Sequence, residues 1–210
     1  MTSMRSPKSS SVNSTGSLSE ISCRFVTSVL KETSRLHAQL SQGQIELIAQ
    51  AAARMMQAIR AGHKIIWFGN GGSATQGQHM AGEFVGRFQH NRRSLPSISL
   101  TENMASVTAI GNDYAFEQIF SRQIEGLAQS GDIAIGLSTS GNSPNVLEGL
   151  RMAKKLNITT VGLTGQTAGQ MIQLCDICIC VPSKITARIQ EVHLTIGHIL
   201  CALVDEALSS

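Results

Sequence analysis

The sequence is poor in aromatic residues, in charged residues and in long apolar runs. Trp and Tyr occur once each among the 210 residues, and charged residues make up 15% of the chain. No apolar run reaches the roughly 18 residues that span a membrane, so we expect no membrane partner. The formal net charge is only +3 and few aromatics lie among the basic residues, which argues against a nucleic-acid partner. No apolar stretch follows the first basic residues, so no secretory signal is expected.

The cysteines form neither a complete metal-binding motif nor an obvious disulfide pattern. Cys175-x-x-Cys178 is not followed by the second C-x-x-C pair that a zinc site of this type needs. The run around Cys178 and Cys180 alternates with isoleucine and is typical of a buried strand. We interpret the cysteines as small, buried, reduced thiols, which predicts a cytoplasmic protein. The five are Cys23, Cys175, Cys178, Cys180 and Cys201.

Length and composition indicate one domain behind a short tail. Residues 1–19 are rich in Ser and nearly free of apolar side chains, which predicts disorder. Residues 20–210 are long enough for a single domain with a substantial core. Two amphipathic helices are expected first, over about 18–40 and from Ser41 to Gly62, and they are also candidates for contacts between subunits.

Short apolar strands then alternate with helices. This order predicts an α/β fold, a three-layer sandwich of the flavodoxin or Rossmann type, with a five-stranded parallel sheet flanked by helices. The expected strands are His63–Phe68, Leu95–Leu100, Ile133–Leu137, Thr160–Leu163 and Ile177–Val181. The expected helices are Ser73–Phe88, Met104–Ile110, Tyr114–Leu127 behind Asp113 as a cap, Asn145–Leu156, Ala168–Leu174 and Thr186–Leu208.

Three of these strands end in glycine or hydroxyl residues, where parallel sheets bind ligands. The first runs into Asn70-Gly71-Gly72-Ser73, with Ser73 expected to cap the next helix. The third runs into residues 138–143, Ser-Thr-Ser-Gly-Asn-Ser, and the fourth into Thr164-Gly165. Glycines, hydroxyls and helix N-termini together favour a phosphate. Neither G-x-x-x-x-G-K-[ST] nor G-x-G-x-x-G is present, so a monophosphate ester is favoured over a nucleotide.

Two helices carry side chains suited to chemistry. His79 and Glu83 are four residues apart and leave one face of a helix, as an acid–base pair, as metal ligands or as a simple surface contact. The otherwise apolar last helix contains Gln190, His193 and His198, which need polar partners. Histidine and glutamate ligands favour zinc over magnesium. Spacing alone leaves His193 and His198 equally good candidates.

These motifs together resemble the phosphoheptose isomerases of the sugar isomerase (SIS) domain family. The resemblance rests on Gly-Asn-Gly-Gly-Ser, His79-x-x-x-Glu83, Gly111-Asn112-Asp113, residues 138–143 and Arg188-Ile189-Gln190-Glu191-x-His193, and it covers about residues 20–208. It implies a homotetramer with one zinc ion per subunit. The implied zinc ligands are His79, Glu83, Gln190 and His198. The implied substrate and phosphate contacts are Asn70, Gly71, Gly72, Ser73, Arg87, Asn112, Asp113, Ser138, Thr139, Ser140, Ser143 and Gln190.

The resemblance also implies a reaction. It is the isomerisation of sedoheptulose 7-phosphate to D-glycero-D-manno-heptopyranose 7-phosphate through an enediol, at the start of ADP- or GDP-heptose biosynthesis. Glu83 would move the carbon proton and His198 would serve the oxygens, with Asp113 as a further acid or base. Ala187 replaces an acidic residue of some members, which removes one expected contact to a substrate hydroxyl. The alternative is a tetrameric SIS adaptor that binds the replication initiator DnaA; it resembles this chain through His79 but lacks the carboxylate at Glu83.

Overall fold

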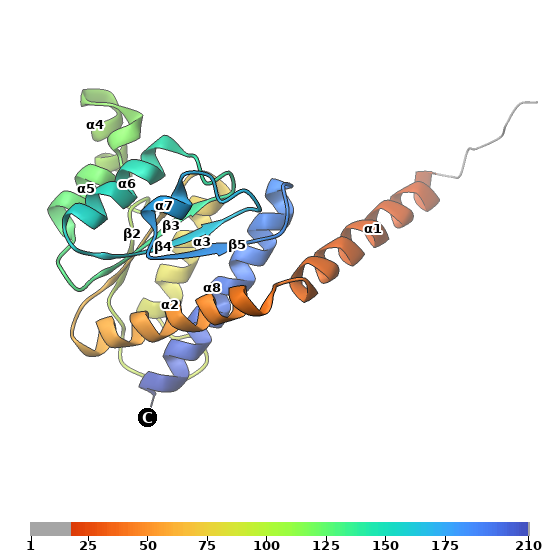
Figure 1. Cartoon of the computed structure of the whole chain (residues 1–210), viewed down its shortest axis with the longest axis horizontal. Helices are drawn as coiled ribbons and strands as arrows, with labels where there is room; N and C mark the ends of the chain where they lie inside the picture. The colour runs from red at the N-terminus through yellow and green to blue at the C-terminus, as the bar shows by residue number, and fades with distance from the viewer. Residues whose placement is uncertain (1–17, 210) are drawn as a thin grey trace, which may run out of the picture.

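The computed structural model describes residues 18–209, which form a parallel sheet between two layers of helices (Figure 1). The predicted disordered tail lies outside the described residues, except for Leu18 and Ser19, which belong to the first helix. No helix in the described part of the chain is both long and apolar enough to cross a membrane.

The predicted strands are all present, in a single sheet. They are β1 (Ile65–Gly69), β2 (Ser97–Ser99), β3 (Ile133–Ser138), β4 (Thr159–Thr164) and β5 (Ile177–Cys180). Every pairing is parallel, in the order β2-β1-β3-β4-β5. The helices are α1 (Leu18–Ala38), α2 (Gln42–Arg60), α3 (Gly72–Val85), α4 (Met104–Asp113), the 3₁₀ helix η1 (Phe116–Gln118), α5 (Ser121–Leu127), α6 (Pro144–Lys155), α7 (Met171–Leu174) and α8 (Thr186–Leu208).

Alternation along the strands produces two cores. Ile65 and Trp67 of β1 face the layer of α2, α3 and α8. Ile66 and Phe68 face the opposite layer, which contains α5, α6 and α7. Strands buried on both faces read as continuous apolar runs, which is why the sequence pattern located them. Figure 1 shows α8 behind α2 on one side of the sheet and α5 and α6 on the other.

The helix predicted over Tyr114–Leu127 is wrong. The backbone is extended at Ala115, and the segment splits into η1 and α5. Asp113 is the last residue of α4 and does not cap a following helix. The break lets Ile119 and Phe120 enter the core while Phe116 stays exposed. Burial of these two side chains overrides the local preference for a continuous helix.

The prediction of unpaired cysteines is confirmed, and the prediction that they are buried is confirmed only in part. All five cysteines are free, and Cys178 and Cys201 are buried. Cys175 and Cys180 are half-buried, and Cys23 is exposed on α1.

Candidate functional site

The glycine loop between β1 and α3 differs from prediction in its cap. Gly71 occupies the N-cap position of α3 with φ 55°, a left-handed conformation that glycine adopts without strain. Ser73 therefore lies inside the first turn rather than at the cap, and its amide donates to the carbonyl of Asn70 at 3.0 Å. No side chain hydrogen-bonds to the N-terminus of α3.

The hydroxyl loop between β3 and α6 gathers its serine side chains. Ser138 Oγ lies 2.8 Å from Ser143 Oγ and 3.4 Å from Ser140 Oγ. Ser143 is the N-cap of α6, but its hydroxyl faces Ser138 and makes no capping bond. Thr139 joins the neighbouring strand end, since its carbonyl accepts from the Gly165 amide at 3.2 Å.

The two loops lie side by side at the carboxyl edge of the sheet. Gly69 pairs with Leu137 in the register of β1 and β3. The amides of Asn70 and Asn145 exchange two hydrogen bonds, each 2.8 Å, which tie the glycine loop to α6. Side chains cap α2 and α4, whereas α3 and α6 have no side-chain cap. The N-termini of α3 and α6, which lack side-chain caps, thus lie next to serine hydroxyls, an arrangement that suits a phosphate.

Three predicted side chains converge between α3 and α8. His79 Nε2 lies 3.1 Å from Glu83 Oε1 and 3.1 Å from His198 Nε2. One ligand atom from each of the three residues lies within 4.8 Å of the others. His79 is exposed, and the other two are half-buried, so a small molecule can reach the cluster.

Packing around the cluster fixes the rings. The His198 ring stacks on Phe88 at 5.7 Å between centroids and meets the His79 ring edge-on at 5.2 Å. The two helices approach closely at Gly197, where an added Cβ would lie 2.4 Å from the sulfur of Met80. A side chain at position 197 would therefore require the Met80 side chain to move.

The donor set fits a zinc ion. Ligands 2.0–2.1 Å from zinc in a tetrahedral site are about 3.3 Å apart, close to the spacings of His79 to Glu83 and His198. Two imidazoles and a carboxylate are ligands that zinc prefers over magnesium. A zinc site with three protein ligands keeps a further position for a water, a substrate or a fourth side chain.

The structure separates the two histidines that spacing could not distinguish. His193 is 1% exposed, and its Nε2 donates to the Thr164 carbonyl at 3.2 Å. Burial lowers the pKa of His193 to about 4, despite the opposing effect of that hydrogen bond. His193 is thus a neutral core histidine, and His198 is the one in the cluster.

Gln190 lies at the glycine loop. Its side-chain Nε2 lies 2.7 Å from the point where a Cβ on Gly72 would be. A Cβ at position 72 would therefore require the end of the Gln190 side chain to move. The backbone carbonyl of Gln190 accepts from Gln76 Nε2 at 2.6 Å. The role of Gln190 as a fourth zinc ligand stays a prediction.

The remaining predicted residues lie apart from the cluster. Arg87 is exposed just after α3. Asn112 donates to Asp113 Oδ1 at 2.8 Å on the exposed end of α4. Within residues 18–209, the structure records no contact between this pair and the cluster. Their proposed contacts with substrate stay predictions.

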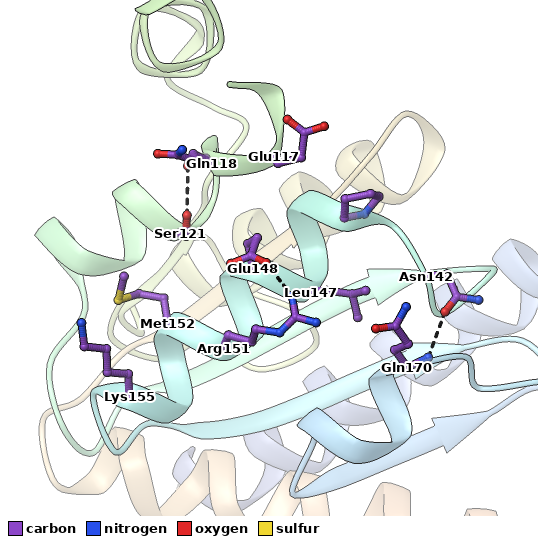
Figure 2. A pocket seen from close by; sticks show the side chains of 11 residues that line it. Glu117, Gln118, Ser121, Asn142, Leu147, Glu148, Arg151, Met152, Lys155 and Gln170 are labelled. Atoms are coloured by element: carbon purple, nitrogen blue, oxygen red, sulfur yellow. Dashed lines mark hydrogen bonds and ion pairs between the residues drawn. The ribbon is translucent and has the colours of Figure 1, made fainter. Parts of the chain in front are cut away.

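A separate pocket of about 670 Å³ lies along α6 (Figure 2). It meets the hydroxyl loop at Asn142, whose side chain accepts from the Gln170 amide at 3.0 Å. Its charged lining is balanced, because Glu148 pairs with Arg151 and Glu117 offsets Lys155. This pocket therefore has no excess of positive charge for a phosphate. Its other lining residues are Gln118, Ser121, Pro144, Leu147 and Met152.

Sequence reasoning missed a buried ion pair next to the cluster. Arg92, in the loop after α3, pairs with Asp205 of α8, and their side chains are 3% and 1% exposed. A lone aspartate in the apolar end of α8 was the available signal, because a buried carboxylate needs a partner.

Comparison with known proteins identifies the family. The SIS domain family matches residues 29–165. A phosphoheptose isomerase from Aneurinibacillus thermoaerophilus is 54% identical over 78% of this chain and 83% of its own. Solved phosphoheptose isomerases from Neisseria gonorrhoeae and Francisella tularensis are 36% and 34% identical, with TM-scores of 0.83 and 0.85, and each match covers 88% of this chain and 98% of the other. The relatives favour the isomerase over the adaptor alternative. The chain belongs to the phosphoheptose isomerase family of SIS-domain proteins.

Proposed function

We propose that this protein isomerises sedoheptulose 7-phosphate to D-glycero-D-manno-heptopyranose 7-phosphate, as its relatives' names indicate, for heptose biosynthesis. The observation that carries the proposal is the convergence of His79, Glu83 and His198 between α3 and α8. The same α3 begins at the glycine loop, so a sugar anchored by its phosphate there extends along the helices toward the cluster.

The phosphate is proposed to bind between the two loops. The hydroxyls of Ser138, Ser140 and Ser143 would donate to its oxygens, together with backbone N–H groups at the uncapped starts of α3 and α6. Ser73 and Thr139 are proposed to complete the site from the same loops. Arg87, one turn beyond Glu83, Asn112 and the amide of Gln190 are proposed contacts for the sugar.

A zinc ion is proposed at His79, Glu83 and His198, with Gln190 as the fourth ligand. When bound, it would polarise the substrate carbonyl and stabilise negative charge on the oxygen during enediol formation. The support is the match between the ligand spacings and a tetrahedral site.

The proton transfers are assigned to the protein side chains. Glu83 Oε1 faces His79, while Oε2 has no hydrogen bond within the described part of the chain. We assign Oε2 as the base that takes the proton from one carbon and returns it to its neighbour. His198, held by Phe88, serves the two substrate oxygens. Asp113 is proposed as a further acid or base.

Assembly and location are also proposals. Apolar residues on α1 are 53–85% exposed and lie on a helix that projects beyond the sheet domain (Figure 1): Leu18, Ile21, Phe25, Val26 and Leu30. An apolar face of this size supports burial against other subunits, as in a homotetramer. The free thiols support a cytoplasmic protein.

The variant Glu83→Gln tests the proposed chemistry. It removes the base and one charged ligand at nearly constant shape, so turnover of sedoheptulose 7-phosphate should fall by about 10²- to 10⁴-fold while the melting temperature stays close to wild type. Glu125→Gln, at an exposed position on α5, is the control and should keep full activity. Near-normal turnover by Glu83→Gln would refute the assignment.

A further inference from the structure

The buried pair Arg92–Asp205 connects the two helices that carry the cluster. Asp205 lies on α8 two turns beyond His198, and Arg92 lies in the loop that follows α3. Both side chains are almost fully buried, so neither is placed to touch a bound substrate directly.

Arg92 holds the end of α3 at Glu83. Its Nη2 donates to the Glu83 carbonyl at 3.0 Å and its Nη1 donates to the Phe84 carbonyl at 3.0 Å. Both carbonyls lie in the last turn of α3, where the helix itself supplies no donors. A cation at this end of a helix is also favourable for the helix dipole. The backbone of Glu83 is thereby fixed by a side chain from outside the helix.

Asp205 holds the loop on α8. One carboxylate oxygen accepts from the Gln89 amide at 2.9 Å and from the His90 amide at 2.7 Å, while the other accepts from Arg92. The same loop places Phe88 against the His198 ring. One chain of contacts therefore runs from the Glu83 backbone through Arg92 and Asp205 to α8, and a second runs from the loop to His198.

We propose that Arg92 and Asp205 are positioning residues that hold Glu83 and His198 at the spacing required for metal binding and proton transfer. The inference rests on the proposed function, because it concerns the geometry of that same cluster. Some residues orient metal ligands without binding the metal themselves. Mutating such residues typically changes metal affinity or activity by about 10- to 100-fold. An effect of that size is expected here without any change in the ligands themselves.

The experiment compares Asp205→Asn with a matched control at Asp132, which immediately precedes the central strand β3. Asp132 is also 1% exposed, and it accepts from the Lys64 and Gln129 amides and from Lys64 Nζ. Asp132→Asn therefore removes a buried carboxylate whose partner Lys64 is 22% exposed, and within residues 18–209 neither residue contacts the cluster. The probe is Co²⁺, followed by its visible absorption spectrum and by competition with a chelator, together with kcat and KM for sedoheptulose 7-phosphate.

Asp205→Asn should weaken Co²⁺ binding by about 10- to 100-fold, alter its spectrum and lower kcat more than it raises KM. Asp132→Asn should lose comparable thermal stability and keep the wild-type spectrum and affinity. If Asp205→Asn does not fold, Arg92→Lys serves instead. Lysine keeps the charge but cannot span Asp205 and both carbonyls, so the Co²⁺ spectrum of this variant should change too.

Equal Co²⁺ affinities in wild type and the Arg92 or Asp205 variants would overturn this inference alone. A wild type that binds no Co²⁺ would overturn the proposed metal site as well.

Discussion

We expect the wild type to lose stability in mild acid because of His193. Replacing His193 by glutamine should abolish that loss. His193 is buried on α8 against the carbonyl of Thr164, and burial lowers its pKa from 6.5 to about 4. In the unfolded chain the imidazole regains its ordinary pKa. Between pH 6.5 and 4 the unfolded state therefore binds more protons than the folded state, and the free energy of unfolding falls as the pH falls.

The size of the effect follows from the pKa difference. Each unit is worth about 1.36 kcal/mol, so the shift of His193 corresponds to about 3 kcal/mol lost between pH 6.5 and 4. Above pH 6.5 the free energy of unfolding contains the full contribution of about 3 kcal/mol from neutral, buried His193. Below pH 4 both states are protonated at this position, and no further loss arises from His193.

The assay is urea unfolding at a series of pH values from 4 to 8, with a chelator present so that metal binding at His79 and His198 does not contribute. Glutamine keeps a donor for the Thr164 carbonyl but does not titrate. The stability of His193→Gln should therefore vary with pH by about 3 kcal/mol less than that of the wild type across this window. Above pH 6.5, where His193 contributes no pH dependence, the two curves should run parallel, which serves as the internal control. Parallel curves for wild type and His193→Gln between pH 6.5 and 4 would refute the description of His193 as a neutral core histidine.

Two further predictions concern the hydroxyl loop and the first helix. Gly141 has φ 67° and a Cβ there would lie 2.0 Å from the Ala168 carbonyl oxygen, so Gly141→Ala should cost at least about 2 kcal/mol in urea unfolding and raise KM. Gly126→Ala, at a helical position with open space, should be neutral or stabilising by up to about 1 kcal/mol, and equal effects of the two changes would contradict this reasoning. Phe25→Ser combined with Leu30→Ser should lower the molar mass found by sedimentation, and an unchanged mass would remove α1 from the subunit contacts.

The sequence predicted β1, β3 and the two loops that follow them because each of these strands is an apolar run that stops at glycine or serine. That signal is local and needs no knowledge of tertiary contacts. The cap of α3 was assigned to Ser73 instead of Gly71 because a serine preference is visible in sequence, whereas a left-handed backbone is not. The split before α5 depended on which side chains enter the core, which only the packed structure decides.

The cluster could be predicted only in part. His79 and Glu83 share a helix face by spacing alone. His198 could be chosen over His193 only through the resemblance, since which face of α8 meets α3 depends on contacts such as Gly197 with Met80. Arg92 and Asp205 are 113 positions apart, and no periodic pattern joins a loop residue to a distant helix.

The most direct test of the proposed function is turnover of sedoheptulose 7-phosphate by the purified protein, before and after removal of metal with a chelator and again after addition of zinc. Isomerisation that disappears on chelation and returns with zinc is the predicted result, because His79, Glu83 and His198 are the proposed ligands of that ion. Isomerisation that persists unchanged in the chelator would contradict the role of the metal. An absence of turnover under every condition would contradict the proposed function itself.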